Sequence, residues 1–306
     1  MSIIITGANG YVGKSICEFL YNKGIHFKTV TRGNIRHHFH YGNNVSCDFS
    51  EPFDLLNELN GYRYLIHLAS CVHNRRNFSV DEYRVINIEA TRLLVNQASS
   101  AKMHRFIFFS SAAVFGQQSV PLVPFTSISD CSPVTEYGKS KYMAEKEIKN
   151  ICKDSELSYS IIRPPMIYGK DAPGNWSKLL KLLRLRLPVP LGSIRNLRSF
   201  LYIGNLLSFI EALIKSKKAK NKVLLVTDDN DISTTALINE IKTNQKYHFI
   251  NFKLNIFLLN FACKLLRLEN ESIQLTNDMQ LDIACTKSEL DWEPPFDVKE
   301  SIKKSI

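Results

Sequence analysis

Short apolar runs alternate with longer stretches of helical periodicity through the first half of the chain. The apolar runs predict strands at residues 2–6, 28–31, 64–69, 106–110 and 160–163. The periodic stretches between them predict helices at residues 12–22, 54–59, 83–99 and 135–153. Buried strands separated by helices are typical of βαβ units. The pattern therefore predicts an α/β fold with a Rossmann-type doubly wound parallel sheet, which binds its ligand at the carboxyl ends of the strands.

The pattern changes after Arg163, where prolines interrupt the chain repeatedly, beginning with Pro164-Pro165. We expect a dinucleotide-binding domain over residues 1–165 and a smaller, irregular substrate-binding region over residues 166–306. Segments between about 196 and 228, at residues 199–203 and 223–227, are expected to return to the sheet. Residues 252–268 form an apolar stretch with three basic residues. It predicts a packed helix of the substrate region, with an interfacial helix as the alternative.

The first apolar run ends in a glycine-rich turn, Thr6-Gly7-Ala8-Asn9-Gly10-Tyr11-Val12-Gly13. This spacing brings backbone N–H groups close to a pyrophosphate at the start of a helix. Lys14-Ser15 makes the turn superficially similar to a P-loop, which would need glycine in place of Ala8. We therefore predict a dinucleotide site; a purely structural turn is the alternative. Its cofactor-binding residues would be Gly7, Asn9, Gly10, Tyr11, Val12 and Gly13.

A second group of residues suits proton transfer. Tyr137 and Lys141 are four residues apart on a predicted helix, so their side chains share one face. An ammonium beside a phenol favours the phenolate, and we expect Lys141 to lower the pKa of Tyr137. Ser111, at the end of the preceding strand, would hold a substrate oxygen while Tyr137 exchanges its proton. The Tyr-Lys spacing also arises by chance in many helices, so its combination with the glycine turn carries the prediction of nicotinamide-dependent hydride transfer.

Composition narrows the class of protein. The 306 residues are 44% hydrophobic, and no signal peptide or apolar run of membrane-spanning length is evident, which predicts a cytoplasmic globular protein without a membrane span. Seven scattered cysteines without zinc spacing predict reduced thiols and no metal site. The net charge of +10 favours a phosphate-bearing substrate or an anionic membrane face. It does not indicate nucleic acid, because the basic stretches lack interleaved aromatic residues.

Taken together, these motifs resemble those of extended short-chain dehydrogenases/reductases of the nucleotide-sugar epimerase/dehydratase type. The resemblance covers nearly the whole chain. Its landmarks stand at residues 6–13, 48–49, 67–70, 87, 108–116, 137–141, 163–169 and 198–203.

The resemblance implies roles at the matching positions. Ser111, Tyr137 and Lys141 would be catalytic, with Ser111 and Tyr137 also touching the substrate. Asn175 and Arg198 would bind the substrate, Arg198 gripping its diphosphate, unless Arg198 is only a solvated surface charge. The cofactor would be lined by Asp48 and Phe49 at the adenine, by Leu68, Ala69 and Ser70, by Lys141, and by Pro164 and Ile167 near the nicotinamide.

The end of the second strand departs from many NAD-preferring relatives, which carry an acidic residue there. This chain has Thr31, followed by Arg32 and then Arg36 nearby. An arginine at this place accommodates a 2′-phosphate. We therefore expect Arg32 to bind the cofactor, and NADP in preference to NAD.

Segments 163–169, 174–176 and 189–199 resemble a narrower group in bacterial O-antigen and surface-polysaccharide synthesis. That group includes 4-ketoreductases that make UDP-N-acetylquinovosamine. The expected reaction is reduction of a UDP-4-keto-6-deoxy-N-acetylhexosamine, and the alternative is a UDP-hexose 4-epimerase with tightly bound NAD. Ala112 argues against a dehydratase, and the intact catalytic residues argue against a non-catalytic sensor. The resemblance also implies a homodimer, and a lipid-linked sugar with peripheral membrane contact stays open.

Overall fold

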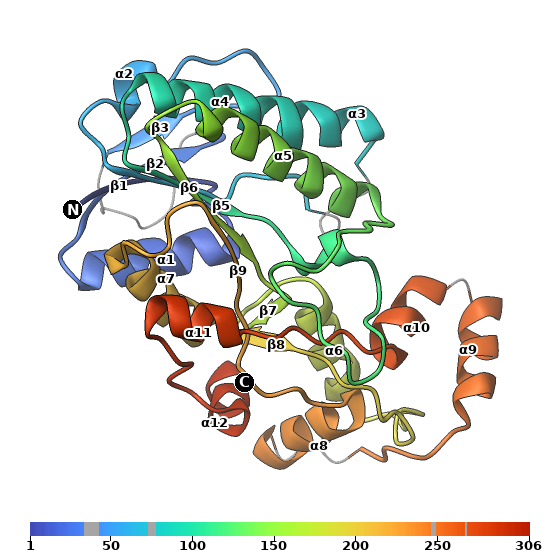
Figure 1. Cartoon of the computed structure of the whole chain (residues 1–306). Coiled ribbons are helices and arrows are strands. Elements are labelled where there is room, and N and C mark those ends of the chain that lie inside the picture. The colour runs from blue at the N-terminus through green and yellow to red at the C-terminus, as the bar shows by residue number, and fades with distance from the viewer. Residues whose placement is uncertain (34–42, 73–77, 246–248, 267) are drawn as a thin grey trace.

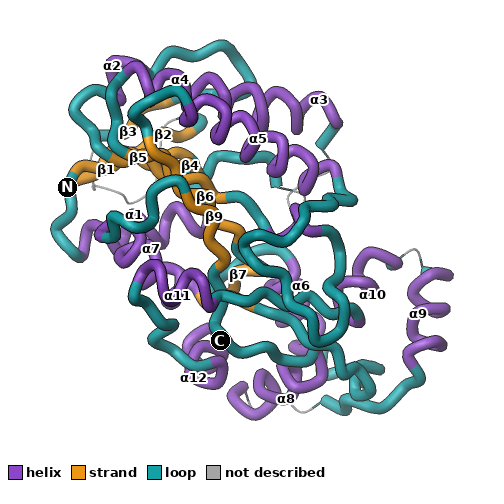
Figure 2. Tube along the Cα trace, in the orientation of Figure 1, coloured by secondary structure: helices purple, strands orange, loops and turns teal. Residues whose placement is uncertain are grey.

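The computed structural model describes residues 1–33, 43–72, 78–245, 249–266 and 268–306. A seven-stranded parallel sheet runs through its centre in the order β3-β2-β1-β4-β5-β6-β9 (Figures 1 and 2). Its strands are β1 (Ser2–Thr6), β2 (His26–Thr31), β3 (Asn44–Ser46), β4 (Tyr64–His67), β5 (Arg105–Phe109), β6 (Ser158–Arg163) and β9 (Lys222–Leu225). Strand order reverses at β1, so the carboxyl ends of β1 and β4 meet at the switch point where such sheets bind ligands.

Helices cover both faces of this sheet, as the alternating pattern predicts. One face carries α1 (Tyr11–Asn22) and α7 (Ile203–Lys215), and the other carries α2, α4 and α5 (Figure 1). The helices of the second face and the turns that lead into them are α2 (Leu56–Leu59), α3 (Val80–Glu82), the π-helix η1 (Tyr83–Glu89), α4 (Ala90–Ser100), the 3₁₀ turn η2 (Ala112–Phe115) and α5 (Glu136–Lys153). The α/β doubly wound fold predicted from the sequence is confirmed.

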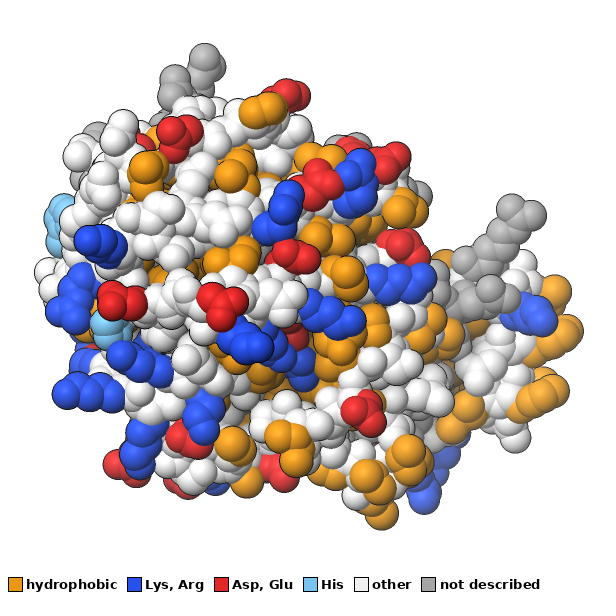
Figure 3. All heavy atoms as spheres, turned by 45° about the horizontal axis from the view of Figure 1, so that its top comes forward, with side chains coloured by type: hydrophobic (Ala, Val, Ile, Leu, Met, Phe, Trp, Pro, Cys, Tyr) orange, Lys and Arg blue, Asp and Glu red, His pale blue; other side chains and the backbone are white. Residues whose placement is uncertain are grey.

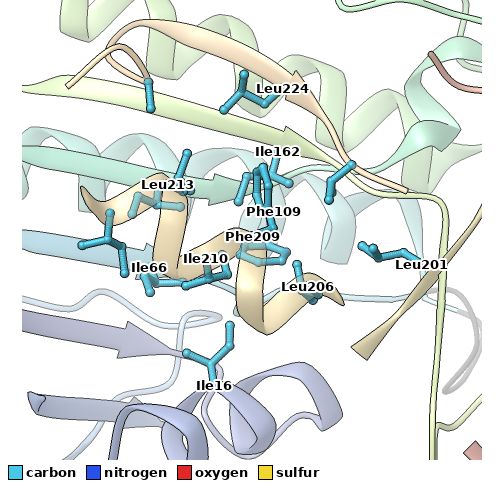
Figure 4. Packing of buried hydrophobic residues seen from close by; sticks show 14 of the residues in the cluster. Ile16, Ile66, Phe109, Ile162, Leu201, Leu206, Phe209, Ile210, Leu213 and Leu224 are labelled. Carbon is cyan, nitrogen blue, oxygen red and sulfur yellow. The ribbon is translucent and has the colours of Figure 1, made fainter. Parts of the chain in front are cut away.

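The core lies where these helices press on the sheet. Figure 4 shows Phe209, Ile210 and Leu213 of α7 packed against side chains of the central strands, among them Phe109 and Ile162. All but Phe109, which is 6% exposed, are fully buried. Each large apolar side chain removed from water in this way contributes about 1.5–3 kcal/mol, so the strands that end at the candidate site rest on a rigid layer.

The second half of the chain builds a smaller region below the sheet (Figure 1). A two-stranded parallel sheet joins β7 (Met166–Tyr168) to β8 (Phe200–Tyr202). The expectation that residues 199–203 return to the main sheet is therefore wrong, because β8 finds its partner in β7; the expectation for residues 223–227 is met by β9, which pairs with β6. The remaining helices are α6 (Asn175–Arg184), α8 (Thr234–Gln245), α9 (Ile256–Leu265), α10 (Glu269–Thr276), α11 (Ala284–Leu290) and α12 (Val298–Ser305).

Helix α9 departs from the expectation of a packed helix. Leu259 is its one buried residue, and Phe257 and Leu265 are 76% and 70% exposed. With α10, it projects to the side of the molecule, away from the main sheet (Figure 1). The prediction failed because the stretch is apolar on nearly all sides, so burying one stripe leaves the rest in contact with water.

Candidate active site

The glycine turn forms a tight passage from β1 into α1. Gly7 has φ +71°, and a Cβ there would lie 2.6 Å from the backbone nitrogen of Ala69 at the end of β4. A Cβ on Gly13 would lie 2.4 Å from the carbonyl oxygen of Gly7. Gly10 begins α1 without a side-chain cap among the described residues, and the first turn contains no acidic residue. The backbone N–H groups of the first turn of α1, and the positive end of the helix dipole there, fit the pyrophosphate of a dinucleotide.

Gly7→Ala is expected to lower the free energy of unfolding by about 2–4 kcal/mol, for two reasons. The new Cβ would clash with the backbone of Ala69, and alanine is strained at the positive φ of this residue. It should also abolish dinucleotide binding. Gly24→Ala is the matched control: its φ is +65°, but nothing lies within 4 Å of the added Cβ, so only the strain cost of about 1–2 kcal/mol applies. Urea unfolding and calorimetric titration with NAD measure the two effects. Equal destabilisation by both substitutions would contradict the close approach at Gly7.

The carboxyl ends of β2 and β3 supply the residues expected at the adenosine. Asp48 accepts hydrogen bonds from the backbone N–H and the hydroxyl of Ser50, at 3.0 and 2.7 Å, and these bonds lower its pKa. Arg32 is exposed and close enough to lower the pKa of Asp48 further. The Thr31 hydroxyl is buried and donates to the carbonyl oxygen of Gly33. Arg36 lies outside the described residues.

Phe49, which is expected to flank the adenine, is largely buried. Its ring is 8% exposed and packs edge-on against Phe53, with ring centroids 4.9 Å apart. It also lies 5.9 Å from the ring of His67. The side chain belongs to the hydrophobic core on this side of the sheet, where its ring is removed from water.

The end of β4 is tied to the helix that carries Tyr137. The Asn87 side-chain oxygen accepts from the Cys71 N–H at 2.8 Å and from the Ser70 hydroxyl at 3.0 Å. Its nitrogen donates to the Ser140 hydroxyl of α5 at 2.9 Å. Asn87 is buried in the π-helix η1, a distortion often found at functional sites. Leu68, Ala69 and Ser70 are partly buried at this strand end.

Asn87 was only a landmark in the sequence. The fold makes it the connection between strand β4 and helix α5, because it satisfies buried polar groups on both elements. The signal that could have identified it is an amide side chain in an otherwise apolar helical stretch.

Ser111 and Tyr137 come together as predicted. Ser111 follows β5, and its hydroxyl accepts from the backbone N–H of Ala113 at 3.1 Å to cap the η2 turn. Tyr137 lies in the first turn of α5, capped by Thr135. A hydrogen bond from Ser111 lowers the pKa of Tyr137, but burial outweighs it and raises that pKa to about 12. Tyr137 therefore keeps its proton at neutral pH.

Lys141 lies one turn further along α5 and is 3% exposed. Its Nζ donates to the carbonyl oxygen of Phe109 at 2.8 Å and lies 4.6 Å from the centre of the Phe108 ring. Burial lowers the pKa of this amine to about 7. The expectation that Lys141 lowers the pKa of Tyr137 is not met, since the raised pKa of the phenol has burial as its largest cause and Lys141 is not among the causes.

A buried ion pair joins α5 to strand β6. Glu145 follows Lys141 by one turn and is fully buried. The Arg163 guanidinium of β6 donates to both its carboxylate oxygens, from Nε at 3.0 Å and from Nη2 at 2.6 Å. The Ser110 hydroxyl donates to Glu145 at 2.5 Å. The sequence does not predict this network, because its partners are 18 and 35 residues apart.

Asn175 and Arg198, the expected substrate residues, both contact the segment that contains α10. The Asn175 side-chain nitrogen donates to the side-chain oxygen of Gln274. Arg198 donates from Nη1 to the backbone carbonyl of Asn277 at 2.9 Å, and burial lowers its pKa to about 10. A surface hollow lined by residues 118–121 and 276–278 lies beside this contact. Arg198 is thus a partly buried cation beside a hollow, which suits an anionic ligand.

The last two expected cofactor residues lie where β6 leaves the sheet. Pro164 is buried, and its carbonyl oxygen accepts from the N–H of Ala112, next to Ser111, at 2.8 Å. Ile167 is partly buried in β7 against the main core. Pro164 therefore borders the turn that holds Ser111.

The arrangement can hold a dinucleotide and move a proton at one oxygen beside Ser111 and Tyr137. Where the chain is described, no three His, Cys, Asp or Glu side chains gather as metal ligands. No described helix combines the length and apolar character needed to cross a bilayer. At Ser111 and Tyr137 the structure offers a hydroxyl and a phenol that lie next to each other.

Known proteins share this sequence and architecture. The model of the NAD dependent epimerase/dehydratase family matches residues 3–226. The UDP-glucose 4-epimerase of Vibrio cholerae is 31% identical over 317 residues, covering 99% of this chain and 94% of that protein. The N-acetyl-alpha-D-glucosaminyl-diphospho-ditrans,octacis-undecaprenol 4-epimerase of Escherichia coli O157:H7 is 26% identical over 272 residues, covering 86% and 78%. A UDP-glucuronic acid 4-epimerase from Bacillus cereus, solved in complex with NAD, shares the fold with a TM-score of 0.79 at 17% identity, covering 100% and 97%.

Proposed function

The chain belongs to the NAD-dependent epimerase/dehydratase family, and from that membership we propose that it interconverts the C4 epimers of a UDP-activated sugar with bound NAD. The contact of Ser111 with Tyr137, one helical turn before buried Lys141, carries the proposal. The names of the relatives support C4 as the reacting carbon and UDP-sugars as the substrate class. The glycine turn at the start of α1 supports a dinucleotide cofactor.

The residues of the chain would handle the proton of the sugar 4-hydroxyl. The turn that begins at Gly7 would hold NAD, which would supply the hydride acceptor and donor. The Ser111 hydroxyl would hold the C4 oxygen. The Tyr137 phenol would donate its proton to the oxygen of the C4 ketone, and the resulting phenolate would take the proton of the 4-hydroxyl in the opposite direction. Lys141, one turn further along α5 with its Nζ held by the Phe109 carbonyl, would favour that phenolate by its charge. Arg198 would hold the diphosphate at the far end.

A 4-ketoreductase is the second candidate, and Arg32 is the observation that favours it. The exposed guanidinium follows β2, where an acidic residue would reject a 2′-phosphate. A reductase delivers hydride once and must exchange its cofactor, for which NADPH is a common source. Under this alternative the substrate would be a UDP-4-keto-6-deoxy-N-acetylhexosamine for surface-polysaccharide synthesis.

Purification followed by cofactor analysis tests the two reactions. We expect NAD to remain with the protein and UDP-glucose and UDP-galactose, or their N-acetylated counterparts, to interconvert without net NADPH consumption. Stoichiometric oxidation of NADPH with a UDP-4-keto-6-deoxy sugar would show that the protein is a reductase and not an epimerase. Failure of both reactions, with cofactor bound, would reject hydride transfer at C4 of a UDP-sugar.

A further inference from the structure

Helix α9 presents an apolar surface that nothing in the described chain covers. Ile256, Phe257, Leu258, Phe261 and Leu265 are between 40% and 76% exposed, and we call them the α9 face. Single exposed apolar residues are ordinary, but a contiguous group on one projecting helix marks an interaction surface. Helices α9 and α10 form a projecting lobe. Figure 3 shows hydrophobic side chains along the outer edge of this lobe, at the right of the view.

A second strip of exposed apolar residues continues the α9 face. Val189 and Phe252 bond through their backbones, the Phe252 N–H donating to the Val189 carbonyl at 3.0 Å. The Val189 N–H donates to the Ile250 carbonyl at 2.9 Å. Beside this ladder, Leu187, Ile250 and Phe252 are 56%, 66% and 41% exposed. The apolar surface therefore extends from α9 to the end of α6.

The two segments that carry this surface hold basic residues and no acidic ones. Residues 178–192 and 249–266 contain Lys178, Lys181, Arg184, Arg186, Lys253 and Lys264 and no aspartate or glutamate. Acidic residues resume at Glu269, in α10. Phenylalanine and leucine with flanking basic residues are the composition of helices that lie in the headgroup region of an anionic bilayer.

The charge of these segments also favours a membrane over a second copy of this chain as the partner of the α9 face. A two-fold contact of the α9 face with itself would bring Lys253 and Lys264 of both copies toward one another, and residues 249–266 contain no acidic residue to offset this repulsion. An acidic lipid surface meets the same positive charge with the opposite sign.

The lobe is also attached to the substrate end of the candidate site. Asn260 of α9 accepts from the Ser272 hydroxyl of α10 at 2.6 Å. From the same segment, Gln274 bonds to Asn175, and Asn277 accepts from Arg198. A surface bound by α9 would therefore lie next to the residues assigned to the substrate diphosphate.

We propose that the α9 face and the adjoining strip dock on an anionic membrane surface, and that the site takes a sugar diphosphate carried on a membrane lipid. The substrate part rests on the proposed function, whereas the docking part does not. A diphosphate held by Arg198 and Asn175 would lie next to the segment that contains α10, and α10 packs against α9. The name of the Escherichia coli relative, with its undecaprenol-linked sugar, agrees with this substrate class.

Vesicle co-sedimentation of the full chain tests the docking. We expect binding to phosphatidylcholine vesicles that contain phosphatidylglycerol, weakening with added salt, and little binding to pure phosphatidylcholine. Phe257→Ser with Phe261→Ser should lower binding by about tenfold or more. Ile128→Ser, which alters a residue 91% exposed elsewhere, is the matched control and should bind like the wild type. Equal binding by wild type and the double variant would overturn the docking.

Two further measurements separate the remaining outcomes. Sedimentation velocity of the wild type and the double variant without vesicles should be the same; an oligomer lost in the double variant would assign the face to a second copy. Turnover of a polyprenyl-diphosphate-linked N-acetylhexosamine in the anionic vesicles should fall in the double variant, while turnover of a soluble UDP-sugar stays unchanged. Equal turnover of the lipid-linked sugar by both proteins would overturn the substrate part. Absence of any turnover with intact vesicle binding would reject the proposed function and leave the docking standing.

Discussion

Tyr137→Phe is expected to lower kcat by about 10²- to 10⁴-fold, the usual contribution of a positioned acid or base. The phenol lies beside Ser111 and holds its proton throughout the neutral range, because burial raises its pKa to about 12. Removing its oxygen removes the proton relay and leaves the ring packing in place. KM for the sugar nucleotide should change little, since the diphosphate contacts lie elsewhere.

Tyr83→Phe is the control for this substitution. The Tyr83 ring is buried 6.5 Å from the ring of Tyr137, so the variant removes a neighbouring phenol of the same kind. Its kcat should stay near that of the wild type. Steady-state kinetics on the two variants, with thermal unfolding to verify their folds, measures the difference. A Tyr137→Phe protein with wild-type kcat would show that the phenol carries no proton in the reaction.

Arg163→Met is expected to lower the free energy of unfolding by about 3–5 kcal/mol, because it leaves the Glu145 carboxylate buried without its counter-ion. The two side chains are 3% and 0% exposed, and their nitrogen and oxygen approach to 2.6 Å. Water does not reach the carboxylate to replace the lost guanidinium. The loss should be visible as a lower midpoint of urea unfolding with an unchanged slope.

The double variant Arg163→Met with Glu145→Met distinguishes charge from shape. Replacing a buried pair by apolar residues of similar volume is often neutral, so the double variant should recover most of the lost stability. If it is as unstable as Arg163→Met alone, packing rather than the uncompensated charge is the cause. Ser110 then loses its acceptor as well, which sets the limit of the recovery.

The sequence predicts the parallel sheet well because its strands are buried on both faces and read as apolar runs. The predicted strand at residues 2–6 coincides with β1, and the other four predicted strands differ from β2, β4, β5 and β6 by one or two residues at their ends. Strand β3 has no such run: Asn44–Ser46 is a short edge strand with no buried residue. Strand β7 follows Pro164-Pro165, a pair that predicts a break in the chain and not a strand. The sequence therefore shows no partner for β8 other than the main sheet, whereas the structure pairs β8 with β7.

The candidate site shows the same division between local and distant information. Tyr137 and Lys141 are predictable because one helix fixes their spacing. The pKa of Tyr137 is not, since it depends on burial by elements far along the chain. The Glu145–Arg163 pair joins a helix to a strand that is packed against it only after folding. Asn87 likewise gains its role from Cys71 and Ser140, which tertiary structure brings to it.

The pairing of β9 with β6 also bears on how the protein is made. Residues 158–163 leave the ribosome long before their neighbour at residues 222–225, with β7, α6, β8 and α7 synthesised in between. Until then β6 is an open edge whose Ile161 and Ile162 backbones have no outer neighbour, a surface prone to wrong pairing between nascent chains. The main sheet is therefore complete only after residue 225 has been made, and a fragment that ends at residue 165 would keep β6 as an unpaired edge.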